Sequence, residues 1–280
     1  MPNYGYHFAR AQGRLTQALY QSFLPLITRQ PIRCSRQVPI DVFSYSGERR
    51  LAEQVASIRS FLRHAGRPQR FVVVSDGSHT SAGIELLKRL DDCVSVEQVP
   101  LPPDSAPEPF ASYLRNHPTG KQLALIMSLP RQRPAFYVDS DVLFFPSARE
   151  LEHELAQTSA PACYLADCGF SGDKRLLHGK QEESNPVNTG TLLLLHSLDW
   201  SLGISRFLEL KGAPDFFTNQ TITHLAMHAN AAQPFNPAKY VLQLDDQFVY
   251  PDRYAGPALV LRHYVDPVRH KFWTSLIPDA

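Results

Sequence analysis

The chain has 280 residues, of which 43% are hydrophobic and 20% are charged, as in an ordinary globular protein. This length is enough for one large domain or two small ones, without a metal ion or disulfide to stabilise the core. Lys and Arg number 28 and Asp and Glu number 27, so the net charge is +1. With such a balance, the protein as a whole has no electrostatic field that would attract a nucleic acid or an anionic membrane. A local basic patch is still compatible with it.

The cysteines and the N-terminal residues indicate the cellular compartment of the protein. Cys34, Cys93, Cys163 and Cys168 form no C-x-x-C pair and match no zinc module, so we expect free thiols in a reducing environment. No apolar stretch approaches the ~20 residues of a membrane span. Residues 1–30 resemble a short amphipathic helix that ends at Pro25, not a signal peptide. We therefore expect a cytoplasmic protein, and peripheral membrane association stays open.

The first hundred residues alternate between strand and helix patterns. A β-branched and aromatic strand at 39–45 is followed by a helical apolar face at 48–64. A continuous apolar strand at 70–75, a helix near 84–90 and a strand at 94–99 follow. This order predicts a parallel sheet flanked by helices.

The remaining chain continues the α/β pattern with longer loops. Residues 100–109 form a Pro-rich loop, Ser147 and Glu150 have the spacing of a capping box, and 168–187 reads as a mobile loop. The expected helices are 121–129, 198–210 and 219–228, and the expected strands are 135–138, 163–167, 189–196, 241–244 and 259–263. No repeat or linker is visible, so we expect a single domain.

The segment from Phe136 to Phe145 contains the most informative motif. Asp139 and Asp141 lie two residues apart between apolar stretches, and in extended backbone they point to the same side. Two carboxylates beside a core repel each other and lose hydration, so they need a compensating cation or hydrogen bonds. Mg²⁺ or Mn²⁺ is the natural candidate. The alternative is a turn in which both carboxylates accept backbone N–H bonds.

A third candidate metal ligand lies near the C-terminus, although a histidine alone is more often structural. His263 follows a short strand, and a neutral imidazole would complete a site with the two carboxylates. Arg269, His270 and Lys271 then form a basic run before Trp273. A mobile basic tail can cover the phosphates of a nucleotide and neutralise a leaving diphosphate. The alternative is a solvated tail.

The motifs in this order resemble a known family. They are the D-x-D strand, Asn188-Thr189-Gly190, Asn219-Gln220 and the tail that starts at His263. Together they are similar to the GT-A-fold nucleotide-sugar glycosyltransferases, in particular glycosyltransferase family 8, the glycogenin and galactosyltransferase-like group. The resemblance implies a Rossmann-like α/β domain with a mixed, mostly parallel central sheet over residues 38–280. Residues 1–37 would be an N-terminal helical extension.

The resemblance also implies roles for particular residues. Asp139, Asp141 and His263 would bind Mn²⁺ or Mg²⁺, Lys271 would touch the donor diphosphate, and Gln220 would lie near the anomeric carbon. The other residues that match positions around the nucleotide-sugar are Phe43, Ser44, Tyr45, Asp76, Lys121, Ser140, Asn188 and Gly190.

The chain departs from the family pattern at three places. Asn219 replaces an aspartate before Gln220, Asp266 stands where the family has glycine, and the lysine and tryptophan of the tail arrive two residues late. Arg269 or His270 is therefore an alternative to Lys271.

The implied reaction is metal-dependent transfer of a sugar, most simply from a UDP-sugar, to an unknown hydroxyl acceptor with retention of configuration. Beside Gln220 the sequence shows no carboxylate nucleophile, so we expect the acceptor hydroxyl to attack the face that the diphosphate leaves. An inverting reaction would need a general base. Asp245 and Asp246 are candidates for it, or for acceptor binding, and a simple turn explains them equally well.

Two other functions use the same motifs. A haloacid-dehalogenase-type phosphatase would use Asp139 as nucleophile, with Lys239 and the Asp245-Asp246 pair as later motifs, although that fold normally opens with this strand. The second is a nucleotide-sugar-binding protein without turnover.

Overall fold

The computed structural model describes residues 3–34 and 36–276. Its main feature is a seven-stranded sheet with the strand order β3-β2-β1-β4-β7-β6-β8. All neighbouring pairs are parallel except those of β7, which runs antiparallel to β4 and β6. The strands are β1 (Gln37–Ser46), β2 (Arg67–Ser75), β3 (Val94–Gln98), β4 (Ala135–Val138), β6 (Ala162–Ala166), β7 (Val187–Leu194) and β8 (Gln233–Pro234). The predicted mixed, mostly parallel sheet is confirmed.

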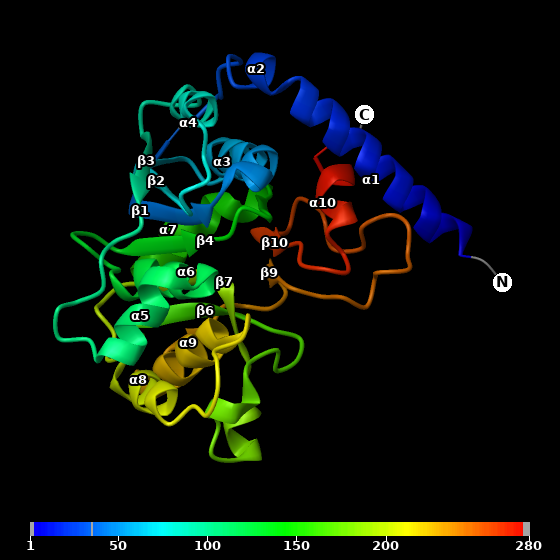
Figure 1. Ribbon diagram of the computed structural model, residues 1–280. Helices are drawn as coiled ribbons and strands as arrows, with labels where there is room; N and C mark the ends of the chain where they lie inside the picture. The colour runs from blue at the N-terminus through cyan, green and yellow to red at the C-terminus, as the bar shows by residue number, and fades with distance from the viewer. Residues whose placement is uncertain (1–2, 35, 277–280) are drawn as a thin grey trace.

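The sheet is buried on both faces, which explains why its strands are nearly continuous apolar runs. Val73 and Phe136 pack on one face, while Val72, Val74 and Tyr137 pack on the other. Helices α3 (Leu51–His64), α4 (Ser81–Lys88) and α7 (Leu151–Gln157) cover the first face. Helices α5 (Glu108–Asn116), α6 (Pro118–Met127), α8 (Ser201–Leu208) and α9 (Thr218–Ala229) cover the second. The result is a three-layer α/β/α arrangement (Figure 1).

Three local predictions differ from the structure. Helix α5 begins inside the Pro-rich segment, because Pro107 and Pro109 flank its first residue, where the missing N–H groups cost nothing. The expected capping box does not form, since the Ser147 hydroxyl donates to the carbonyl of Pro257 and Glu150 pairs with Lys239. The helix there starts as a 3₁₀ turn at Pro146–Glu150.

The third difference is the segment 168–187, which contains 3₁₀ turns at Lys174–Leu176 and Lys180–Glu183. Glu182 in the second turn accepts a 2.8 Å bond from Arg206, and its carbonyl contacts His224. The loop expected to be mobile is thus tied to α8 and α9.

A second sheet of three short strands, β5 (Val142–Phe144), β10 (Leu261–His263) and β9 (Tyr240–Val241), lies beside the main one. β10 runs antiparallel to β5, with His263 opposite Val142. The register brings a residue from the end of the chain next to the D-x-D turn.

The N-terminal helix α1 (Tyr4–Ser22) runs along the outside of the molecule and packs on the C-terminal helix α10 (His270–Thr274) (Figure 1). The contact is close at Gly13, where a Cβ atom would lie 2.6 Å from the carbonyl oxygen of His270. The predicted helix is confirmed, but it ends at Ser22, and a separate turn α2 covers Leu24–Ile27. Within the described residues, no helix has both the length and the apolar character needed to span a bilayer.

Candidate active site

The candidate site lies at the edge of the sheet where β1, β2 and β4 end. β7 is antiparallel, so its first residues lie beside the end of β4, and the Asp139 N–H donates to the Gly190 carbonyl at 2.9 Å. β6 ends next to the same place, with Leu165 opposite Asn188. Ligands of open α/β sheets bind at this carboxyl edge. Topology alone therefore gathers Asp139, Asp141, Asn188 and Asp167.

Asp139, Asp141 and His263 form a compact group with metal-ligand chemistry. One potential ligand atom from each lies within 4.8 Å of those of the other two. The His263 Nε2 atom is 3.0 Å from an Asp141 carboxylate oxygen and 3.7 Å from an Asp139 oxygen. Two carboxylates and one imidazole are a donor set that suits Mn²⁺ and Mg²⁺.

The local charges favour an ionised Asp141. Burial opposes ionisation, but His263 and the Arg269 guanidinium outweigh it and lower the Asp141 pKa to about 2. Arg269 lies 2.6 Å from the second oxygen of that carboxylate. Burial raises the pKa of Asp139, and the neighbouring carboxylate of Asp141 adds to the rise. The pair is therefore a concentrated negative centre that a cation stabilises.

The orientation of Asp139 depends on residues that the sequence did not reveal. Its Oδ1 atom accepts bonds from Tyr137 Oη at 2.7 Å and from Gln122 Nε2 at 3.0 Å. Asn219 in turn donates to Gln122 Oε1 at 2.9 Å. Oδ2 remains to face His263, so the Tyr137 hydroxyl and the Gln122 amide fix which oxygen points into the site. Asn219, where the family pattern has aspartate, thus supports the carboxylate through Gln122.

His263 is oriented by Asn188. The Asn188 Oδ1 atom accepts from the Gly190 N–H at 2.9 Å and lies 3.0 Å from His263 Nδ1. An Nδ1–H that donates to this oxygen directs Nε2 at the two carboxylates: a protonated Nε2 donates to Asp141 at 3.0 Å, and a deprotonated Nε2 would offer its lone pair to a metal ion. Gly190 makes the arrangement sterically possible, since a Cβ atom there would lie 2.1 Å from the His263 ring.

A second polar group adjoins the first. Asp167 accepts from Asn188 Nδ2 at 3.1 Å and from Gln220 Nε2 at 3.3 Å. From the sequence we expected no carboxylate nucleophile beside Gln220, and the structure places the Asp167 carboxylate there. Its position directly after β6, at the same edge as the D-x-D strand, is the signal that would have identified it.

The other residues matched to the nucleotide-sugar lie in different environments. Phe43 is fully buried in the core, and Ser44 donates to Gln54 at 2.8 Å, so both pack β1. The Tyr45 hydroxyl is buried, and among the described residues it has no hydrogen-bond partner. Asp76 accepts from Ser78 at the end of β2. Ser140 is buried in the D-x-D turn, and Lys121 lies next to Gln122 on α6, partly exposed.

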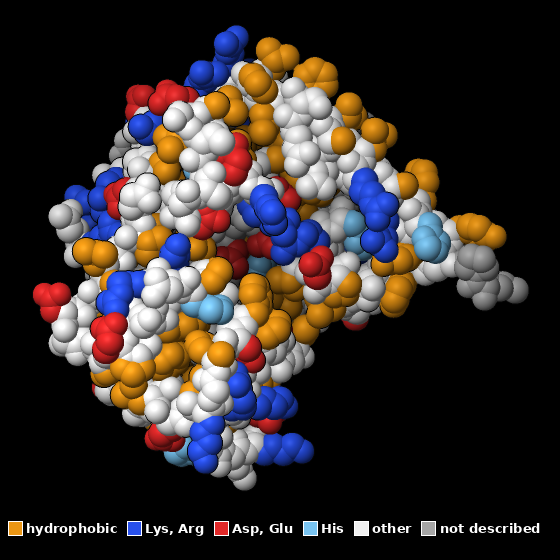
Figure 2. All heavy atoms as spheres, viewed as in Figure 1, with side chains coloured by type: hydrophobic (Ala, Val, Ile, Leu, Met, Phe, Trp, Pro, Cys, Tyr) orange, Lys and Arg blue, Asp and Glu red, His pale blue; other side chains and the backbone are white. Residues whose placement is uncertain are grey.

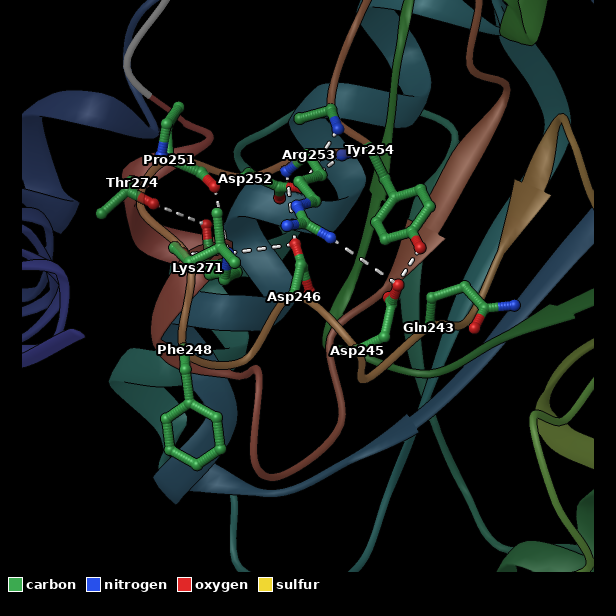
Figure 3. Close-up of polar contacts among 12 residues, drawn as sticks. Gln243, Asp245, Asp246, Phe248, Pro251, Asp252, Arg253, Tyr254, Lys271 and Thr274 are labelled. Atoms are coloured by element: carbon green, nitrogen blue, oxygen red, sulfur yellow. Dashed lines mark hydrogen bonds and ion pairs between the residues drawn. The ribbon is translucent and has the colours of Figure 1, made fainter. Parts of the chain in front are cut away.

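The structure places Lys271 and Asp246 away from the roles proposed for them. The Lys271 ammonium group is buried, 3.0 Å from Asp246, and donates to the carbonyls of Val249 and Pro251. Asp246 also accepts hydrogen bonds from Arg262 Nη2 at 2.8 Å and Nη1 at 3.0 Å. Figure 3 shows Lys271 directed at Asp246, and Asp245 directed at Tyr254 and Arg253 instead. A fully buried, doubly paired carboxylate is unavailable as a general base.

This buried ion cluster supports the site indirectly. Arg262 also pairs with Asp252 and lies between the rings of Tyr254 and Tyr264, about 5 Å from each. Successive residues of a strand point to opposite sides, so Arg262 enters the cluster while His263 faces the carboxylates. Lys239, required by the phosphatase alternative, pairs instead with Glu150 at 2.5 Å.

A hollow of about 190 Å³ lies between α1 and α10, next to the carboxylates. Its lining is mainly basic, and Figure 2 shows Lys and Arg side chains above a recess that contains acidic and histidine side chains. The charged residues around the hollow are Arg10, Arg14, Arg50, Glu53, Asp266, Arg269 and His270. Arg269 belongs to both the hollow and the carboxylate site.

The fold is that of GT-A glycosyltransferases, as the resemblance implied. The structure is similar to galactosyltransferase LgtC in complex with donor and acceptor sugar analogues, with a TM-score of 0.56, 14% identity, and coverage of 84% of this chain and 94% of that chain. Mouse xyloside xylosyltransferase 1 gives a TM-score of 0.55 at 14% identity, over 83% of this chain and 99% of that one. GlyE of Streptococcus pneumoniae gives 0.53 at 14% identity, over 87% and 61%.

The comparisons of sequence gave no match. No family model matches the chain, and no curated protein matches it. The likeness to solved structures therefore establishes the fold, and the function has to be argued from the site.

Proposed function

We propose that the chain is a metal-dependent glycosyltransferase that moves a hexosyl group from a nucleotide-sugar, most simply a UDP-sugar, to a hydroxyl acceptor with retention of configuration. The observation that carries this proposal is the joining of two groups at one sheet edge. The Asp139–Asp141–His263 group is linked through Asn188 to the Asp167–Gln220 group. The first suits a metal-bound diphosphate and the second suits the hydroxyls of a sugar.

Asp139, Asp141 and His263 would hold Mn²⁺ or Mg²⁺, which supplies positive charge against the donor diphosphate. Arg269 is the neighbouring cation, and its guanidinium can form two parallel hydrogen bonds to a phosphate. On donor binding it exchanges its contact with Asp141 for one with the diphosphate. Arg269 thereby stabilises the charge that develops on the leaving group.

Asn188, Asp167 and Gln220 would bind and orient the sugar. The amides of Asn188 and Gln220 donate hydrogen bonds to the Asp167 carboxylate. Sugar hydroxyls can replace these hydrogen bonds one for one. As expected from the sequence, we propose that the acceptor hydroxyl attacks the donor sugar on the same face that the diphosphate leaves. Asp167 lies close enough to Gln220 to stabilise positive charge on the sugar ring during that step.

Tyr45 is the residue best placed for the nucleotide base. Burial raises the pKa of its hydroxyl, which stays protonated and has no partner within the described chain. A base carbonyl would satisfy this donor. All four cysteines are free thiols, which supports the proposal of a cytoplasmic location.

A binding experiment tests the proposal. Calorimetric titration of UDP-sugars and GDP-sugars into the protein should show binding with Mn²⁺ present and little binding after chelation. Asp141→Asn should weaken Mn²⁺ binding by more than about a hundredfold, because loss of an outer-shell partner alone costs 10- to 100-fold. Asp92→Asn is the matched control, since the Asp92 side chain is fully exposed.

The other functions predict different results. Metal-dependent release of UDP from the preferred donor, slow in water, is expected of a transferase. Cleavage of simple phosphate esters without nucleotide-sugar binding would favour the phosphatase. Donor binding without any UDP release would favour a binding protein. Equal Mn²⁺ binding by Asp141→Asn and the native chain would overturn the metal assignment.

A further inference from the structure

Helix α1 has two apolar faces, and only one is used by the fold. Ala9 and Gly13 are buried against the rest of the protein, and Tyr20 contacts Trp273 of α10. Six large apolar residues of α1, α2 and the joint between them are instead 50% to 77% exposed. They are Tyr4, Phe8, Leu15, Leu19, Phe23 and Leu26.

The exposed residues form one continuous outer stripe. From Tyr4 to Leu26 each follows the last by three, four or seven residues, which is the spacing of a single helix face. At about 100° per residue, this face is turned about 120° around the helix from Ala9 and Gly13. Figure 2 shows the stripe as a row of hydrophobic side chains along the outer edge of α1. Contiguous exposed apolar surface of this kind marks an interaction site.

The charged residues around the outer stripe indicate which class of partner binds it. The first 40 residues contain five arginines and no aspartate or glutamate. Arg10 and Arg14 are exposed on one flank of α1, and Arg29 and Arg33 are exposed beyond α2. A second copy of this chain would bring the same cations against each other. An anionic lipid surface offers acyl chains to the stripe and negative headgroups to the arginines.

We propose that α1 docks the protein on an anionic membrane surface, with the outer stripe at the boundary between headgroups and acyl chains. A helix of 19 residues is about 28 Å long and lies in the plane of the surface without crossing it. The net charge of +1 does not oppose this, because the basic residues of the first 40 positions are local. The inference goes beyond the proposed transferase and does not depend on it.

Vesicle flotation with the full chain tests the docking. The native protein should float with vesicles of 30% phosphatidylglycerol in phosphatidylcholine. The double variant Leu15→Glu/Leu19→Glu should reduce the bound fraction at least about tenfold, since two buried anchors are lost and two like charges are added. Leu101→Glu is the matched control, because Leu101 is 86% exposed and lies in the Pro-rich loop, far along the chain from α1.

The basic residues are tested separately. Arg10→Gln/Arg14→Gln and raised salt should each weaken flotation with anionic vesicles. Asp141→Asn should float like the native chain, so a failure of the metal site is distinguished from a failure of docking. The variants at Arg10, Arg14, Leu15, Leu19 and Leu101 should keep the native circular dichroism spectrum, as these side chains are exposed.

Three results would overturn the docking. The first is absence of flotation by the native chain. The second is flotation that the outer-stripe variant leaves unchanged. The third is a lipid-free dimer, seen by sedimentation, that the outer-stripe variant converts to monomers while neither protein floats. That last result would assign the stripe to a second copy of the chain.

Discussion

At the scale of single residues, the site depends on a contact between a glycine and a histidine. Gly190 lets the His263 ring lie against β7, where Asn188 Oδ1 orients it. By their resemblance to the family, Asn188 and Gly190 were expected around the nucleotide-sugar. The structure adds a steric and hydrogen-bonding reason for both residues that does not depend on any sugar.

We expect Gly190→Ala to displace His263, because the added methyl group would lie 2.1 Å from its ring. Mn²⁺ affinity measured by calorimetry should fall at least about tenfold. The free energy of unfolding should fall by about 1–3 kcal/mol, as for an overpacked core. Gly169→Ala is the control, since a Cβ atom there meets nothing within 4 Å. Unchanged Mn²⁺ binding in Gly190→Ala would remove His263 from the ligand set.

At the scale of elements, β10 is held between two polar environments of different kinds. Arg262 faces the buried ion cluster with Asp246, Asp252 and Lys271, and His263 faces the metal-ligand group. The cluster joins the loop after β9, strand β10 and helix α10. Lys271 resembles a diphosphate-binding residue in the sequence. In the structure it belongs to this cluster, which holds β10 and so positions His263.

The cluster predicts an acid-dependent stability. Burial opposes the charge on Asp246, but bonds from Arg262 and Lys271 outweigh it and lower the Asp246 pKa below its usual 3.8. A lowered pKa stabilises the fold above the unfolded value, and this contribution is lost as pH falls through the folded value. Asp246→Asn should therefore cost about 3–5 kcal/mol at pH 7 in urea unfolding. Its difference from the native protein should shrink below about pH 4.

Asp245→Asn is the neighbouring control. Asp245 is more than half exposed and contacts Tyr254 and Arg253, so its loss should change stability by less than about 1 kcal/mol at any pH. Equal effects of the two substitutions would mean that the buried pairing of Asp246 does not stabilise the fold.

At the scale of the whole molecule, the sequence predicted the sheet well because its strands are uninterrupted apolar runs. β1, β2, β4 and β7 were located within a few residues. Helix α5 was missed because prolines mask its pattern, and the 168–187 segment was misjudged because its order comes from contacts with α8 and α9.

The site was only partly predictable for a similar reason. Asp139, Asp141 and His263 belong to motifs that the sequence displays. Asp167 and Gln122 act through neighbours 53 and 97 residues away in the chain, and no local pattern reports such contacts.

Metal binding should stabilise the entire fold, since its ligands come from β-strand ends far apart in sequence and the unfolded chain cannot collect them. Mn²⁺ at a hundred times its Kd should add about 2.7 kcal/mol. Scanning calorimetry should show this as a Tm increase of about 5 °C, reversed by chelation. Asp141→Asn should show no increase. An equal increase for that variant would place the bound ion elsewhere.

The distance in sequence between Asp141 and His263, 122 residues, also has a consequence during protein synthesis. The two carboxylates leave the ribosome long before the histidine, and β10 adds to β5 only after residue 263 has emerged. Until then the nascent chain carries the two carboxylates without their histidine. Its capacity to bind the metal through all three residues thus arises in one step, near the end of translation.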